Sequence, residues 1–486
     1  MKYHPIAEGN SKQQENNSSL QQAGDVVRAA ITLLVMVHHA CIMAYMRYCT
    51  FLRNHHHETS SLWLDGFQKY VLLCIGLESN ELMWFSVSRL LSRAESAAAQ
   101  FQQDREPRYI DEAIVLDRQA LELCTAGHPR RSACLFQLAI HLSARYEVFG
   151  GVETLNEAIL MDRDTLALCP PGDPNRAMSF NNLAVNLTTR YKLLGRVDDL
   201  NEAILLDRDS LALRPPGHPD RSMSLNNLAL NLAARYNQLG GADDLDEAIL
   251  LDRDTVALRP PGHPDRSMSL NNLAIHLATR YRLLGGVDDL DEAILLDRDA
   301  VALRPPGHPD RSMSLNNLAI RLGTRYNLLQ RVDDLDEAIL LDRDSLALRP
   351  PGHPRRSSSL HNLAMHLATR YKLLGGADDL NEAILLDRDG LVLRPPGHLD
   401  RFISLNNLAA HLATRYKLLG GADDLNEAIL LDRDALTLCP PGHPERPTSL
   451  NNLADHLGTR YKLVGGLLHS VFGKPCSLLV YSVTRS

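Results

Sequence analysis

The chain has 486 residues, and its 51 basic side chains are nearly balanced by 59 acidic ones. Basic and acidic residues are interleaved and form no basic stripe, which excludes nucleic acid as the main partner. The eight cysteines form no C-x-x-C pair and no His/Cys spacing suited to zinc. We therefore expect no disulfide framework, no metal and no cofactor, and we expect a reducing compartment, the cytoplasm.

The N-terminal region, residues 1–84, is predicted to be helical but has no clear pattern. Its first residues are polar, which argues against a cleaved secretory signal. An apolar run then covers residues 29–45, with His38 and His39 near its middle. This run is barely long enough to cross a bilayer, and histidines are costly there. A buried or capping helix is therefore favoured over a membrane span.

One internal repeat organises most of the chain. The pair Arg145-Tyr146 returns seven times at a constant spacing of 45 residues, and the last copy is Arg460-Tyr461. An Ala-Ile pair and the glycine of a Pro-Pro-Gly-His-Pro motif keep the same phase. Three markers in phase over more than 300 residues cannot arise by chance, so the chain contains a tandem array.

The first half of one unit, which runs from Pro219 to His263, has the pattern of an amphipathic helix. Pro219 suits its first turn, and Gly240 suits its end. Apolar residues recur at spacings of three and four and form one stripe, made of Leu225, Leu228, Leu232, Tyr236 and Leu239.

The second half of the unit predicts another helix. Asp244 is predicted to cap it, and Glu247, three residues later, completes a capping box. The slot of Thr255 holds only small residues in the other copies, which indicates close helix packing. The predicted buried side consists of Leu245, Ala248, Ile249, Leu251, Val256 and Leu258. No strand pattern interrupts the array, so the predicted fold class is all-α.

The unit resembles a tetratricopeptide repeat. In the second helix, Ala248, Thr255 and Pro260 fall at the family's alanine, alanine and proline spacing, and Leu232 and Tyr236 match the first helix. The unit is longer than the usual ~34 residues. Its phrase GHPDRSxSLNNLA is similar to the longer repeats of kinesin light chain. It resembles more closely the arrays of fungal proteins that often carry a CHAT (caspase-like) peptidase domain.

The resemblance implies an α-α superhelix of about eight helical hairpins over residues 85–464. Residues 446–464 are expected to form a lone first helix that caps the array. Only 25 residues follow Tyr461, too few for a CHAT peptidase, and the N-terminal region lacks the sustained heptads of kinesin light chain. The tail 465–486 has no assigned role.

The function implied by the resemblance is a non-enzymatic scaffold that binds a protein or peptide along a concave groove. No G-x-S-x-G, P-loop or H-E-x-x-H motif is present, and every polar motif recurs whereas an active site is unique. Two alternatives stay open. One is a regulatory or sensor arm of a CHAT-peptidase or immune-type switch system, and the other is a membrane-tethered scaffold.

Several polar motifs have simple structural interpretations. The acidic cluster around Asp244 lacks the loop spacing of a calcium site and is better explained as helix capping. The histidines of the Gly-His motif, such as His218, lie one repeat apart and cannot share a metal, which favours a linker role. A second set, His141, His276, His366, His411 and His456, lies on first helices and is expected to be solvated or hydrogen-bonded between repeats.

Paired asparagines are the best candidates for binding. A carboxamide both donates and accepts, so a ladder of them could hold an extended peptide backbone. The alternative is bonding within or between helices. The candidate asparagines are Asn182, Asn226, Asn227, Asn271, Asn272, Asn316, Asn317, Asn362 and Asn407. Cations on the same predicted side hint at an acidic peptide, and these are Lys192, Arg282, Lys372 and Lys417.

Overall fold

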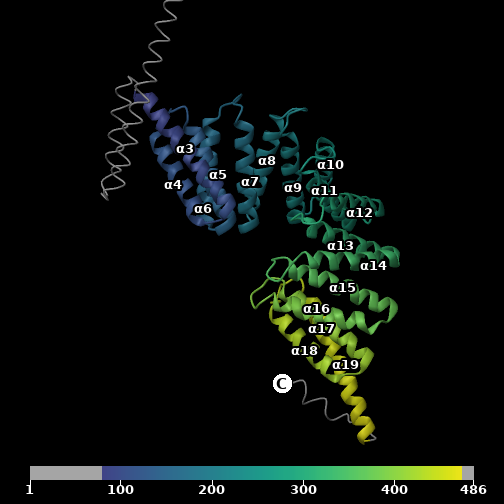
Figure 1. Ribbon diagram of the computed structural model, residues 1–486. Helices are drawn as coiled ribbons and strands as arrows, with labels where there is room; N and C mark the ends of the chain where they lie inside the picture. Colours follow the sequence, from purple (N-terminus) through teal and green to yellow (C-terminus); the bar gives the residue numbers. More distant parts are fainter. Residues whose placement is uncertain (1–78, 473–486) are drawn as a thin grey trace, which may run out of the picture. The chain divides into compact units, whose positions relative to one another are not determined.

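The computed structural model describes residues 79–472, which form seventeen α-helices and no strand (Figure 1). They make eight antiparallel hairpins followed by one unpaired helix, which confirms the predicted all-α solenoid. The first helices of the hairpins, and the final helix, are α3 (Ser79–Asp104), α5 (Arg131–Phe149), α7 (Arg176–Leu194), α9 (Arg221–Leu239), α11 (Arg266–Leu284), α13 (Arg311–Leu329), α15 (Arg356–Leu374), α17 (Arg401–Leu419) and α19 (Arg446–Phe472). The second helices are α4 (Pro107–Leu123), α6 (Val152–Leu168), α8 (Val197–Ala212), α10 (Ala242–Leu258), α12 (Val287–Ala302), α14 (Val332–Ala347), α16 (Ala377–Val392) and α18 (Ala422–Thr437).

The helices belong to two compact units that divide after Leu168. Helices α3 to α6 lie in the first unit, and α7 to α19 lie in the second. The outer helices extend beyond the predicted array 85–464, since α3 begins at Ser79 and α19 ends at Phe472. The apolar run 29–45 lies outside the described residues. Within residues 79–472, no helix is both long and apolar enough to cross a bilayer.

The predicted apolar stripe forms the core between hairpins. Leu228 and Leu232 of α9 are buried together with Leu200 of α8 and Ala248 of α10, so one cluster joins two successive repeats. This shared burial is what stabilises a solenoid, because a single hairpin leaves its stripe uncovered. The small slot is confirmed as well, since Thr255 is fully buried.

Two leucines predicted to be buried are exposed. Leu239 is 61% exposed and Leu258 is 43% exposed, and each is the last residue of its helix. Leu258 lies one turn after the exposed Asp254, on the outer face of α10, and the buried position beside it belongs to Arg259. At the end of α9, the residues that follow Tyr236 are all exposed, so the core ends before Leu239. The prediction was therefore wrong at these two positions.

The linker motif builds two successive β-turns. The His218 N–H donates to the Pro215 carbonyl at 3.0 Å, with Gly217 at φ +93°, which is the conformation of the third residue in a type II turn. The Arg221 N–H then donates to the His218 carbonyl at 3.1 Å. Helix α9 begins at Arg221, so Pro219 precedes the helix and does not occupy its first turn as predicted.

The linker histidines stabilise the second turn. Nδ1 of His218 accepts the backbone N–H of Asp220 at 3.1 Å. The same contact occurs at His128, His263, His308, His353, His398 and His443, with distances of 3.1–3.2 Å. The predicted linker role of these histidines is thus confirmed.

The predicted capping box is wrong. The N-cap of α10 is Gly241, and no side chain caps this end of the helix. Asp243 and Asp244 do lie in the first turn, where the helix dipole favours negative charge. The Asp244 carboxylate instead binds Arg235, and Glu247 binds Arg208 of the preceding repeat. At the other end of the hairpin turn, Gly240 ends α9 as predicted, in the left-handed conformation.

Candidate protein-binding site

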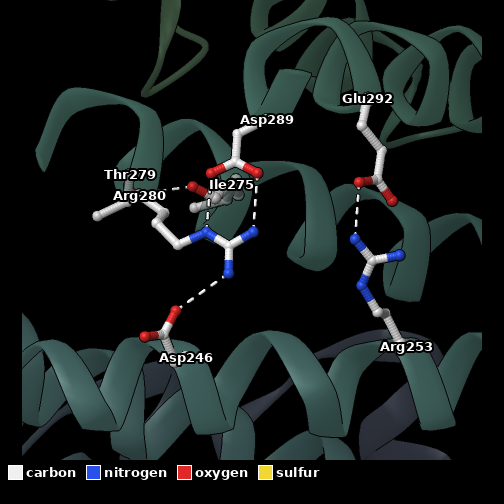
Figure 2. Close-up of polar contacts among 7 residues, drawn as sticks. All are labelled: Asp246, Arg253, Ile275, Thr279, Arg280, Asp289 and Glu292. Carbon is white, nitrogen blue, oxygen red and sulfur yellow. Dashed lines mark hydrogen bonds and ion pairs between the residues drawn. The ribbon is translucent and has the colours of Figure 1, made fainter. Parts of the chain in front are cut away.

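The Arg-Tyr marker places an arginine between three helices. In α11, Arg280 donates through Nε and Nη2 to both carboxylate oxygens of Asp289 at 2.7 and 2.8 Å. Its Nη1 reaches Asp246 of the preceding repeat at 3.0 Å (Figure 2). Arg325 and Arg370 repeat this arrangement. The acidic residues predicted to cap helices therefore bind hairpins together.

A buried aspartate forms a second junction between repeats. Asp252 of α10 is 1% exposed, and its Oδ2 lies 2.6 Å from Nδ1 of His276 in α11. The equivalent pairs are His141–Asp117, His366–Asp342, His411–Asp387 and His456–Asp432. This confirms that the second histidine set bonds between repeats. The aspartate partner was missed, because its spacing of 24 residues crosses the linker.

Two repeats use other partners for this aspartate. Nδ2 of Asn231 donates to Asp207 at 2.7 Å, and Arg321 lies 2.9 Å from Asp297. Burial raises the pKa of Asp207 and of Asp297 to about 7. The hydrogen bond from Asn231 opposes the shift at Asp207, and the charge of Arg321 opposes it at Asp297.

The raised pKa of Asp207 predicts a pH-dependent stability. Between the ordinary value of 3.8 and about 7, the folded protein holds a proton that the unfolded chain has released. The contribution of Asp207 to the free energy of unfolding is therefore fully present below pH 3.8 and is lost as the pH rises through about 7. We expect Asp207→Asn to stabilise the protein at about pH 8, by at most on the order of 3–4 kcal/mol, with the gain vanishing near pH 4.

Urea unfolding of the parent and of Asp207→Asn across this pH range measures the difference. The matched control is Asp209→Asn, because Asp209 is exposed on the same helix. A difference between parent and Asp207→Asn that does not vary with pH would contradict the assigned protonation.

The asparagine pairs form a ladder across the first helices. Nδ2 of Asn227 donates to Oδ1 of Asn181 in the preceding repeat at 2.8 Å, and Asn272 donates in the same way to Asn226 at 3.1 Å. Asn317–Asn271 and Asn362–Asn316 continue the series, and Asn407 lies 3.0 Å from Nδ1 of His361. These bonds hold neighbouring first helices side by side.

The two asparagines of a pair differ in exposure. The first asparagine of the pair is buried at positions Asn226 and Asn271 and half-buried at Asn316. The second is half-buried throughout, in Asn182, Asn227, Asn272, Asn317, Asn362 and Asn407. The inter-repeat bond uses one carboxamide N–H, and a second N–H remains on each donor. Except at Asn316, the second asparagine is therefore the member of the pair that a ligand could contact.

An apolar stripe runs beside the half-buried asparagines. One turn after Asn227, Leu230 is 42% exposed, and the same slot is about equally exposed in Val185, Ile275, Ile320 and Met365. Two turns further on, the helices carry a second set, Leu193, Leu283, Leu328, Leu373 and Leu418. We name these ten residues the first-helix stripe. Its residues share a face with the second asparagines by helical spacing.

The predicted cations border this stripe. Lys192, Arg282, Lys372 and Lys417 are exposed, and each directly precedes a leucine of the stripe. Lys417 lies 3.6 Å from Asp455 in an exposed ion pair. The structure thus brings the second asparagines, the cations and an apolar stripe to one side of the first helices. The buried first asparagines Asn226 and Asn271 lie behind this surface.

These features define a class of molecule by its fold, an α-α solenoid of tetratricopeptide-like helical hairpins. No protein-family model matches the sequence, and no curated protein does. Among solved structures, the chain is similar to nearly identical TPR-like repeats, named for kinesin light chain, from Podosopora anserina. That match has 25% identity and a TM-score of 0.33 over 45% of this chain and 98% of that one.

Two further solved structures show similar helical arrays. BtubC (BKLC) from P. vanneervenii has 16% identity and a TM-score of 0.37 over 49% of this chain and 91% of its own. The quorum sensor NprR from B. thuringiensis, in its apo form, has 12% identity and a TM-score of 0.45 over 81% of this chain and 97% of its own.

Proposed function

We propose that the protein is a non-enzymatic interaction scaffold that binds an extended protein segment along the first-helix stripe. The observation that carries this proposal is the repetition of half-exposed apolar side chains at two fixed slots in successive repeats. Monomeric soluble proteins rarely leave such contiguous apolar surface exposed unless it binds something. Burial of this stripe against a partner would supply the main favourable free energy of binding.

The polar residues of the surface would set the orientation and charge of the partner. Each second asparagine, such as Asn227 or Asn272, can donate its remaining N–H to a backbone carbonyl of an extended segment. Lys192, Arg282, Lys372 and Lys417 favour a partner with acidic residues beside its apolar ones. A segment that combines acidic and aliphatic residues is therefore the proposed ligand class.

We expect loss of the stripe to abolish binding without unfolding the array. The variant Leu230→Ser, Ile275→Ser, Ile320→Ser removes apolar surface from three repeats at positions that are each about 40% exposed. A peptide selected on the parent protein from a random library should bind this variant at least about tenfold more weakly. Fluorescence anisotropy measures the affinity, and circular dichroism verifies the fold.

The matched control removes three leucines from the second helices, by Leu250→Ser, Leu295→Ser, Leu340→Ser. Equal affinity of the parent and the stripe variant for the selected peptide would refute the stripe as the binding site. Asparagine variants are less decisive. Asn272→Ala removes a ligand donor but also removes the donor to the buried Asn226, so its effect on stability has to be subtracted.

We also propose that the protein resides in the cytoplasm. The Sγ atoms of Cys124 and Cys134 lie 3.5 Å apart, yet both are free thiols. Cys169 and Cys439 are buried and free as well. Thiols so close together stay reduced in a compartment with a reducing glutathione pool.

A further inference from the structure

A row of leucines projects from the second helices, away from the core. In α10, Leu250 is 64% exposed, whereas the adjacent Ile249 is only 1% exposed. The same slot is 60–64% exposed in every second helix of the second unit, in Leu205, Leu250, Leu295, Leu340, Leu385 and Leu430. We name these six residues the leucine row. None of them belongs to the first-helix stripe.

Ion pairs connect the helices that carry the row. Arg253, one turn after Leu250, donates to Glu292 at 2.7 Å (Figure 2). Glu292 in turn lies three residues before Leu295 in the sequence. Equivalent pairs are Arg208–Glu247, Arg298–Glu337, Arg343–Glu382 and Arg388–Glu427. Each ion pair therefore connects two successive helices of the row, and it neutralises the charge of its arginine.

Acidic residues border the row. Asp243 and Asp254 lie seven residues before and four residues after Leu250, so helical periodicity places them on its face. Both are exposed. The same two slots are exposed aspartates in the other second helices of this unit, Asp198, Asp209, Asp288, Asp299, Asp333, Asp344, Asp378, Asp389, Asp423 and Asp434. Because the arginines of this slot in α8 to α16 are paired, the surface around the leucines of these helices is negative.

This combination discriminates between kinds of partner. A second copy of the chain docked row to row would place aspartate opposite aspartate, which is repulsive. Anionic lipid and nucleic acid are disfavoured for the same reason. An amphipathic helix with Lys or Arg beside its apolar face satisfies both the leucines and the aspartates.

We propose that the leucine row is a second docking surface, which binds a cationic amphipathic helix. Apolar side chains of that helix cover the leucines, and its basic residues pair with the bordering aspartates. The site is separate from the first-helix stripe, so the scaffold can hold two partners of opposite charge at once.

The probe is a synthetic amphipathic peptide of about 18 residues, or five helical turns, with leucines on one face and lysines on the other. Its affinity for the full chain is measured by fluorescence anisotropy at about 50 and about 300 mM NaCl. One control peptide carries glutamate in place of lysine. A second has the same composition in an order that forms no apolar face. We expect only the first peptide to bind, and to bind more weakly at high salt.

Two variants separate the contributions of the row. Leu250→Ser, Leu295→Ser, Leu340→Ser should weaken binding at least about tenfold, and Asp254→Asn, Asp299→Asn, Asp344→Asn should weaken it and reduce its salt dependence. The stripe variant Leu230→Ser, Ile275→Ser, Ile320→Ser should bind as the parent does. Undiminished binding to the leucine variant, or equal binding of the peptide without an apolar face, would overturn the proposal. Both results are independent of whether the first-helix stripe binds its own ligand.

Discussion

Replacing Leu228 with aspartate is expected to unfold two neighbouring repeats together. Leu228 is 1% exposed and lies in a cluster with Leu200 and Ile204 of the preceding hairpin and Ala248 of its own. A carboxylate there has no cation within the cluster and loses its hydration, so the loss of stability should exceed about 4 kcal/mol. Because the cluster is shared, the damage extends beyond one hairpin.

Hydrogen exchange of Leu228→Asp measures both the size and the extent of this loss. Protection should fall in α8, α9 and α10 and persist in α16 to α18, because a solenoid couples only near neighbours. The matched substitution Asn237→Asp introduces the same charge at an exposed position of the same helix and should change stability by less than about 0.5 kcal/mol. Loss of protection confined to α9 would contradict coupling through the shared cluster.

Removing the buried Arg321 is expected to be nearly as damaging. Arg321 is 6% exposed, and its Nε lies 2.9 Å from Oδ2 of the fully buried Asp297. Arg321→Met leaves this carboxylate without its cation, which costs about 3–5 kcal/mol in comparable buried pairs. The cost should shrink as the pH falls below 7, because the pKa of Asp297 is about 7 and its protonated form needs no counter-charge.

The chain itself supplies the control for this substitution. Histidine occupies the equivalent slot in five repeats, for example His276, whose Nδ1 lies 2.6 Å from Asp252. Arg321→His should therefore retain most of the stability that Arg321→Met loses. Urea midpoints of the two variants at about pH 9, where Asp297 is ionised in the parent, test this, and equal midpoints would show that the pairing with Asp297 contributes nothing.

The array carries two exposed apolar surfaces outside its regular core. The first-helix stripe is only about 40% exposed and is bordered by cations, whereas the leucine row is 60–64% exposed and is bordered by aspartates. We therefore propose two partners of opposite charge and not one. The paired serine variants proposed above each preserve one surface and remove the other.

The asparagine ladder shows how far the surroundings of the candidate binding residues could be predicted. The position of the pairs on first helices follows from helical periodicity. That Asn226 is buried and accepts a bond from Asn272 depends on how closely adjacent first helices approach. The next repeat can bury a residue that lies on the side of a helix. The residue spacing within one repeat does not reveal how close the next repeat lies.

Acidic residues illustrate the same limit. Asp244 has the sequence context of a helix cap, but Arg235 lies nine residues before it across the hairpin turn and binds it at 2.6 Å. The charge-assisted pair replaces the weaker capping bond. Likewise, Asp252 reads as one more acid in an LLDRD phrase, and only the packing of α10 against α11 brings it to His276.

The sequence by itself determined the helices, their pairing and the spacing of the array, because these depend on periodicity and on turn residues that act over a few positions. The sequence also predicted close helix packing at the slot of Thr255 and a structural role for the linker histidines, because both follow from local geometry. The tertiary structure decided which polar groups are buried, which carboxylates pair with which bases, and which leucines remain exposed. These outcomes depend on contacts between repeats. A long side chain such as Arg280 can reach carboxylates on different helices. Which carboxylate it binds depends on distance and desolvation, and neither can be read from the pattern of residues along the chain.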